Sequence, residues 1–334
     1  MIRIGNCFME KMMIANVPTK VERVDFFNKH LNKSVFIKRD DQTGMGTSGN
    51  KIRKLEYLLA DAKNRNCDYL ITSGGNQSNH ARATAVLAAK YQMKSLLILK
   101  ESEINRTEGN LFLNKLVGAT IKLASEEEYQ DLTPMIAKLK KDLTDSGHNP
   151  YVIPMGGSNG IGALGYVEAF YEILRQEQEL GLVFDTIVVT NGSGGTYAGL
   201  LYGNKESNQN KTIIGISVLN QREQAVHDLL HILEDMNQYR NNHFSFSDEE
   251  INIIDSYIGL GYGKSQLDEL RFIEKFAQEE GIILDPVYTG KSMYGLYHEL
   301  KNENLQGSQN ILFIHTGGIF GWTDEKINML YGAV

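Results

Sequence analysis

The sequence has little cysteine and little proline, and it lacks a long apolar run. Its two cysteines, Cys7 and Cys67, are too few for a disulfide framework, and no His or Cys lies at zinc-ligand spacing. No stretch approaches the ~20 apolar residues of a membrane span. Near the start, Asn6, Glu10 and Lys11 interrupt the apolar residues, so no signal peptide is expected. These absences predict a cytoplasmic protein without a metal site and without a membrane partner.

The charge and composition narrow the class of protein further. The net charge of −7 and the scattered lysines argue against a nucleic-acid partner. An apolar content of 42% and a charged content of 22% are ordinary for a globular protein. A length of 334 residues predicts two domains, at about 150 residues for each domain.

Short apolar segments with strand character alternate with amphipathic segments of helical period. This alternation predicts two α/β domains built on parallel sheets, with glycine-rich loops where strands end. The predicted strands cover residues 34–38, 69–72, 95–99, 120–123, 151–154, 186–190, 211–218 and 311–315. The predicted helices cover residues 51–63, 79–91, 111–116, 126–143, 164–177, 223–236, 267–280 and 291–301.

A lysine lies at a loop-to-helix junction in the segment GNKIRKL, residues 49–55. A positive charge at a helix N-terminus opposes the helix macrodipole, so Lys51 is badly placed for stability alone. Lysine amines can form Schiff bases with aldehyde cofactors. Taken by itself, a lysine near a helix start is usually a solvated surface residue.

A second motif, NGSGGT at residues 191–196, follows the strand predicted at 186–190. Its glycines would let backbone N–H groups converge at a helix N-terminus, which favours a phosphate. The spacing does not fit a dinucleotide fingerprint, because Tyr197 stands where the third glycine belongs. A plain tight turn remains the alternative.

A third motif, SGGNQSNH at residues 73–80, follows the strand predicted at 69–72. A turn dense in N–H groups with a serine beside it can hold an anionic substrate and move a proton. Ser78 alone is more often a helix cap than a catalyst, and His80 alone is weak evidence for catalysis. Two tyrosines complete the set of candidates: Tyr262 in GLGYG and Tyr288 in DPVYTGK. By default both are packing residues.

In this order, the motifs resemble the pyridoxal-phosphate (PLP) enzymes of fold type II, the tryptophan-synthase-β type. The resemblance is strongest to the family of D-cysteine desulfhydrases and 1-aminocyclopropane-1-carboxylate (ACC) deaminases, and it spans about residues 17–318. It implies PLP as the cofactor, a small amino-acid substrate and a homodimer. It also implies a large domain of residues 1–50 and 165–334 around a smaller domain of residues 51–164, with the cofactor in the cleft between them.

The resemblance implies a role for each motif. Lys51 would bind PLP and act as the base at the substrate Cα. Ser78 would hold the substrate carboxylate, and Asn79 would lie beside the cofactor's 3-hydroxyl. Tyr262 and Tyr288 would line the active site. The cofactor phosphate would be bound by a loop with four members: Ser193, Gly194, Gly195 and Thr196.

Two threonines separate the two activities of the family. ACC deaminases carry a glutamate after the equivalent of Tyr288, near the pyridine nitrogen, where this chain has Thr289. They also carry a leucine where this chain has Thr316. Both threonines are expected at the cofactor ring, and they favour β-elimination of D-cysteine to pyruvate, ammonia and hydrogen sulfide. The alternatives are ACC deamination, a lyase for D-serine or cysteate, a β-replacement synthase, and a non-catalytic PLP- or amino-acid-binding protein.

Overall fold

The structure is a computed structural model that describes residues 9–101, 106–240 and 243–332. It contains two β-sheets: a six-stranded sheet in the order β1-β2-β10-β7-β8-β9 and a four-stranded sheet in the order β5-β4-β3-β6. The larger sheet consists of β1 (Val21–Val24), β2 (Ser34–Lys38), β10 (Asn310–Ile314), β7 (Thr186–Asn191), β8 (Thr212–Ser217) and β9 (Asn252–Ile254). The smaller sheet consists of β5 (Thr120–Ala124), β4 (Lys94–Lys100), β3 (Tyr69–Gly74) and β6 (Pro150–Val152).

Both sheets are parallel apart from one edge. Within the described residues, β1 and β2 form the antiparallel pair, and the other neighbouring strands run parallel. The predicted fold class is therefore confirmed, with this edge as the exception. Because parallel strands end at the same edge of a sheet, the loops after β7 and β10 lie side by side.

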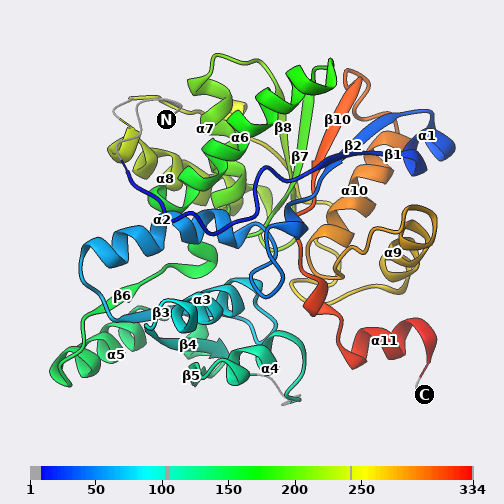
Figure 1. Ribbon diagram of the computed structural model, residues 1–334. Coiled ribbons are helices and arrows are strands. Elements are labelled where there is room, and N and C mark those ends of the chain that lie inside the picture. The colour runs from blue at the N-terminus through cyan, green and yellow to red at the C-terminus, as the bar shows by residue number, and fades with distance from the viewer. Residues whose placement is uncertain (1–8, 102–105, 241–242, 333–334) are drawn as a thin grey trace.

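Helices cover both faces of the larger sheet, with α6, α7 and α8 on one face and α1, α9 and α10 on the other (Figure 1). Alternate residues of one strand enter the two cores: Ile187 packs in one and Val188 in the other. The helices are α1 (Asp25–Leu31), α2 (Lys51–Asn64), α3 (Asn79–Lys90), α4 (Gly109–Leu116), α5 (Thr133–Asp145), α6 (Gly160–Leu180), α7 (Gly195–Glu206), α8 (Arg222–Arg240), α9 (Leu267–Glu280), α10 (Thr289–Lys301) and α11 (Asp324–Tyr331).

The predicted strands and helices are present with ends shifted by about one turn at most, except in one region. The helix predicted over 126–143 is instead a short 3₁₀ turn, Glu128–Gln130, followed by α5 from Thr133. Pro134 explains the difference, because proline has no N–H and its ring is accepted only in the first turn of a helix. Among the strands and α-helices of the described residues, four short ones were not predicted: β1, α1, β9 and α11.

Helix α2 runs between the two sheets and packs on α6 (Figure 1). The strands of the smaller sheet lie inside residues 69–152, within the segment predicted as the smaller domain. Ile52, Leu55 and Leu58 of α2 nevertheless belong to the same core as Tyr166 and Phe170 of α6. The domain boundaries at residues 50 and 164 stay a prediction.

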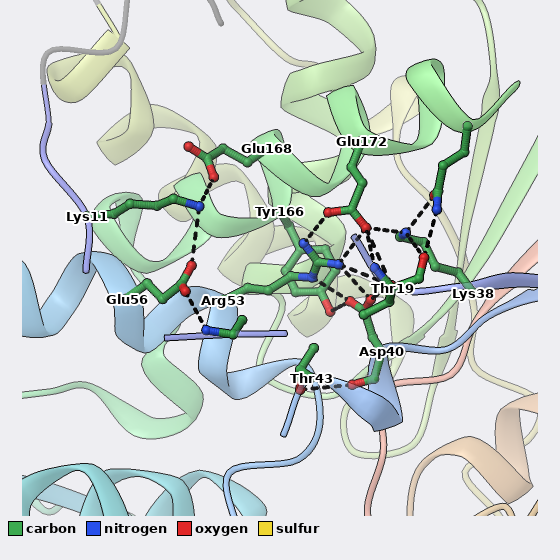
Figure 2. Close-up of polar contacts among 12 residues, drawn as sticks. Lys11, Thr19, Lys38, Asp40, Thr43, Arg53, Glu56, Tyr166, Glu168 and Glu172 are labelled. Atoms are coloured by element: carbon green, nitrogen blue, oxygen red, sulfur yellow. Dashed lines mark hydrogen bonds and ion pairs between the residues drawn. The ribbon is translucent and has the colours of Figure 1, made fainter. Parts of the chain in front are cut away.

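A buried network of charged groups fixes the position of α2 (Figure 2). The Arg53 guanidinium donates two hydrogen bonds of 2.9 Å to Asp40, and its Nη1 donates one of 2.9 Å to Glu172. Lys38 Nζ lies 2.5 Å from Glu172 Oε1, and the Tyr166 hydroxyl donates to Asp40 at 2.6 Å. Burial alone would raise the pKa of Asp40, but Arg53 and Lys38 lower it to about 2. The two cations and the two carboxylates therefore balance inside the protein.

A second set of contacts ties the N-terminal segment to the same helix. Glu56 of α2 accepts hydrogen bonds of 2.7 Å from the backbone N–H groups of Ile14 and Ala15. Lys11 forms ion pairs with Glu56 and with Glu168 of α6 (Figure 2). Charged contacts thus join α2 to the segment after β2, to α6 and to the segment before β1.

Replacing Glu172 with glutamine tests the network, because it leaves Arg53 and Lys38 with only one carboxylate. We expect the free energy of unfolding to fall by about 3–5 kcal/mol, the usual cost of an uncompensated buried charge. Urea unfolding of the full chain measures it. Asp145→Asn is the control, since it breaks the exposed ion pair of Asp145 with Lys141 and should change stability little. Equal small losses in both variants would contradict a structural role for the network.

Candidate active site

A pocket lies where strands of both sheets end and the glycine-rich loops meet. It is lined by four groups of residues that the sequence motifs singled out: Lys51; Ser78 with Asn79 and His80; Gly192, Ser193, Gly194 and Thr196 of one loop; and Tyr262 with Tyr288. The space between its walls is about 870 Å³, part of which is open to solvent. None of the described residues that line it is acidic.

Lys51 is the first residue of α2, and the chain reaches it through a turn that only glycine allows. Gly49 has φ +104°, and a Cβ there would lie 2.6 Å from the carbonyl oxygen of Thr316. The N–H of Asn50 donates to that same oxygen at 3.1 Å. The loop after β10 therefore sets the position at which α2 begins.

Lys54 is a pocket residue that the sequence reasoning missed. It lies one turn after Lys51 on the same side of α2, and its Nζ donates to Gly156 O at 3.2 Å and to Ser158 Oγ at 3.0 Å. The i, i+3 spacing in GNKIRKL was a signal that could have found it. Burial, and secondly the charge of Lys51, lower the pKa of Lys54 well below its ordinary value.

Burial also lowers the pKa of Lys51, to about 8. Two lysines thus share a pocket without a carboxylate to balance them. Such a pocket favours an anionic ligand, and its lysines lose protons more easily than lysines in water.

The loop after β7 forms a tight cradle at the N-terminus of α7. Gly194 has φ +84°, and a Cβ on Gly195 would lie 2.8 Å from both Lys54 Nζ and Ser158 Oγ. Ser158 Oγ also accepts from the Gly195 N–H at 3.2 Å and lies 2.8 Å from Ser193 Oγ. The first turn of α7 leaves N–H groups without helical partners, so the lysine, the hydroxyls and the helix dipole converge where a phosphate would fit.

Asn50 links this cradle to the start of α2. Its Nδ2 donates to Thr196 Oγ1 at 2.9 Å. The hydroxyl of Thr190, at the end of β7, also lines the pocket and has no hydrogen-bond partner among the described residues. An unpartnered buried hydroxyl is costly, so it is a further sign that the pocket holds a polar ligand.

Ser78 is a helix cap and a pocket residue at once. Its Oγ accepts from the N–H of Ala81 at 3.2 Å at the start of α3. A Cβ on Gly74 would lie 2.5 Å from this Oγ, so the glycine makes room for the serine. The serine accepts through its oxygen, which leaves its O–H free to donate toward a ligand.

His80 is neutral, and its tautomer follows from its partner. Burial and the charges of Lys51 and Lys54 lower its pKa well below the ordinary value. Thr72 Oγ1 donates to Ile153 O at 2.9 Å and lies 2.8 Å from His80 Nε2. The imidazole therefore donates from Nε2, and its Nδ1 is a buried acceptor without a partner in the described part of the chain.

Tyr262 and Tyr288 both line the pocket and contact each other. Their hydroxyls are hydrogen-bonded to each other, and their ring centroids lie 5.8 Å apart. Burial raises the pKa of both hydroxyls, so both are neutral phenols near pH 7. Tyr129 and Met155 of the 69–155 region also line the pocket, and no motif signalled them.

The two threonines occupy different environments. Thr316 lines the pocket directly after β10. Thr289 is not among the lining residues: its hydroxyl donates to Asp285 at 2.7 Å, and its N–H donates to the same carboxylate at 2.7 Å. The predicted contact between Thr289 and the cofactor stays a prediction. Thr289 is the first residue of α10, and the Asp285 carboxylate accepts from both its N–H and its hydroxyl.

Together, the fold and the pocket define a two-sheet α/β protein with a cationic site suited to a phosphorylated aldehyde. Residues 13–317 match the family described as pyridoxal-phosphate dependent enzyme, and the chain belongs to that family. PLP is therefore its cofactor, and the residues present fit it: a lysine for the aldehyde and a cradle for the phosphate.

The names of individual relatives refer to two activities, D-cysteine desulfhydrase and ACC deaminase. The chain is 39% identical to a bifunctional D-cysteine desulfhydrase/ACC deaminase of Arabidopsis thaliana over 95% of this chain and 80% of that protein. It is 37% identical to a D-cysteine desulfhydrase of Serratia proteamaculans over 90% and 91% of the two chains. A crystal structure described as an ACC deaminase homologue matches with a TM-score of 0.89 and 36% identity, over 97% of both chains. No helix in the described ranges is long and apolar enough to cross a membrane.

The lowered pKa of Lys51 has a kinetic consequence, because only a neutral amine attacks an aldehyde. We expect the rate at which the cofactor-free protein captures PLP to rise about tenfold per pH unit below pH 8 and to level off above it. Stopped-flow absorbance measures this rate, and Lys51→Ala is the control that should not capture PLP covalently. A rate that keeps rising to pH 10 would show that Lys51 titrates as an ordinary lysine.

Lys54→Met tests the phosphate cradle, since it removes the ammonium beside Gly195 but keeps the length of the side chain. We expect the dissociation constant for PLP to rise at least about tenfold, the value of one charge-assisted hydrogen bond. Fluorescence titration measures it. Lys211→Met is the matched control: Lys211 is also buried, but it pairs with Glu177 and does not line the pocket. Similar affinities in the two folded variants would exclude Lys54 from the phosphate site.

Proposed function

We propose that this chain is a carbon–sulfur lyase that eliminates hydrogen sulfide from D-cysteine and yields pyruvate and ammonia. The observation that carries the proposal is the acid-free lining of the pocket, in which Thr316 offers an uncharged hydroxyl after β10. The D-cysteine desulfhydrase names of relatives at 37–39% identity support it. When bound, PLP supplies the electron sink for the electrons released at the substrate Cα.

Lys51 would hold the cofactor aldehyde and then accept the Cα proton of the substrate on its Nζ. Its place at the start of α2 is fixed by Gly49 and by the Arg53 network. A pKa of about 8 suits a group that must lose and regain a proton near neutral pH. Lys54, Ser158 and the N-terminus of α7 would bind the phosphate.

Ser78 and the N-terminus of α3 would bind the substrate carboxylate. The Ser78 oxygen is engaged by the Ala81 N–H, so its proton is directed to the ligand. The helix dipole adds a favourable field for a carboxylate at this end. Both contacts fix the substrate at its carboxylate end.

Tyr262 and Tyr288 would protonate the departing sulfur. Of two hydrogen-bonded phenols, one donates to the other, and the second proton remains for a ligand. Because burial raises both pKa values, both hydroxyls are protonated near pH 7 and a proton is present for the departing sulfur. Hydrogen sulfide would leave Cβ with that proton while the Cα proton stays on Lys51. The product of this elimination, 2-aminoacrylate, would then react with water to give pyruvate and ammonia.

Ring opening of ACC is the second candidate, since a relative of this chain carries both names. A carboxylate near the cofactor's pyridine nitrogen would favour its protonated form and a stronger electron sink. Thr316 offers only a neutral hydrogen bond. ACC has no ordinary Cα proton and no β leaving group, so its opening needs the stronger sink.

A substrate panel on the PLP-loaded full chain distinguishes these activities. We expect sulfide and pyruvate from D-cysteine and little turnover of L-cysteine. The rate of 2-oxobutyrate release from ACC should be at least tenfold lower than turnover of D-cysteine, which corresponds to a barrier difference of about 1.4 kcal/mol or more. D-Serine and cysteate are included as alternative leaving groups. Faster turnover of ACC than of D-cysteine would overturn the proposal, and turnover of none of them by the PLP-loaded protein would favour a non-catalytic binding role.

A further inference from the structure

Arg82 of α3 is a fully buried cation that no carboxylate of the described residues contacts. Its Nη2 donates to Ser48 O at 2.8 Å, and its Nη1 donates to Asn110 Oδ1 at 3.1 Å and to Asn79 Oδ1 at 3.4 Å. Its guanidinium carbon lies 4.8 Å from the centre of the Phe320 ring. Each of these partners is neutral.

This environment is unusual for a buried arginine, because burying an unpaired charge is costly. The buried Arg53 binds Asp40 and Glu172, and the buried Arg240 binds Glu206. Burial lowers the pKa of Arg82 to about 10, and no acidic group raises it. The arginine stays charged near pH 7, so the structure carries an uncompensated positive charge just behind the pocket.

The charge of Arg82 acts on the pocket through the side-chain amide of Asn79. Asn79 Oδ1 accepts from Arg82 Nη1 and, at 3.1 Å, from Asn110 Nδ2. A guanidinium can only donate, so it holds the Asn79 amide with its oxygen turned toward Arg82. Asn79 lines the pocket, and its Nδ2 donates to none of the described residues. The amide is therefore polarised with its positive end free for a ligand.

The constitution of PLP indicates what that ligand atom is. The aldehyde carbon is flanked on the ring by the phosphate-bearing arm on one side and by the 3-oxygen on the other. With the aldehyde at Lys51 and the phosphate at the Gly195 cradle, the 3-oxygen is the remaining group of the cofactor that can carry a negative charge. Asn79 is a lining residue with a free donor, and Lys54 and the cradle are already used by the phosphate.

We propose that Arg82 is a positioning residue for the cofactor, which orients Asn79 and stabilises the ionised 3-oxygen of PLP through the Asn79 amide. The counter-charge that Arg82 lacks in the protein would then be supplied by the cofactor. The inference rests on PLP as the cofactor and on its 3-oxygen lying at Asn79, and it does not depend on which amino acid is turned over.

The test compares two cofactors in the full-length protein: PLP and its 3-O-methyl ether, which cannot ionise at this oxygen. The measured quantity is the ratio of their dissociation constants, which cancels general effects of a mutation on folding. We expect Arg82→Gln to reduce the preference for PLP about tenfold or more, the value of one charge-assisted hydrogen bond. Arg82→Lys keeps the charge and should stay within about threefold of the wild type, about 0.7 kcal/mol.

Two further variants separate this role from a structural one. Arg240→Gln removes another buried arginine, and it should leave the preference for PLP unchanged. Asn79→Ala should lower the preference as Arg82→Gln does, and the double variant should lower it no further, because both act on one contact. Equal weakening of both cofactors in Arg82→Gln, or additive losses in the double variant, would overturn the proposal. If Arg82→Gln does not fold, the other two variants still test the proposal. Loss of the preference for PLP in Arg82→Lys, or an unchanged preference in Asn79→Ala, would overturn it.

Discussion

The buried ion network around Arg53 is the constraint on which the site depends. Arg53 lies between Lys51 and Lys54 in sequence, but it points to the other side of α2 and binds Asp40 and Glu172. Those carboxylates belong to the segment after β2 and to α6, so one side chain fixes the helix to two other elements (Figure 2). The two lysines on the pocket side are then held in place by charged residues that do not line the pocket.

This arrangement divides the charges of the protein into two zones. On the side of α2 that carries Arg53, the cations and carboxylates form ion pairs with each other. On the other side of the helix, Lys51 and Lys54 face the pocket, which has no acidic lining residue in the described chain. Burial without a counter-ion is what lowers their pKa values, and it is also what makes the site attract a phosphate. Stability and chemistry therefore come from opposite faces of one helix.

Much of the fold and part of the candidate site could be predicted from the amino-acid sequence. The strands and most helices follow from hydrophobic periodicity, and Lys51, Ser78, Tyr288 and Thr316 lie in the pocket as their motifs indicated. The predicted helix over 126–143 was wrong because Pro134 restricts where a helix can begin. Thr289 was expected at the cofactor, and this contact stays a prediction; its hydroxyl donates to Asp285, a local bond that the motif did not indicate.

The sequence by itself indicated the kind of chemistry, because the motifs that resemble a family of PLP enzymes are local features that keep their order along the chain. Only the tertiary structure decided how the charges are used. Lys54 and Arg82 are ordinary basic residues in the sequence. One becomes a pocket residue and the other an unpaired buried cation because segments far apart in the chain surround them. Burial and the identity of distant partners set the energy of a charge, and neither is a property of local sequence.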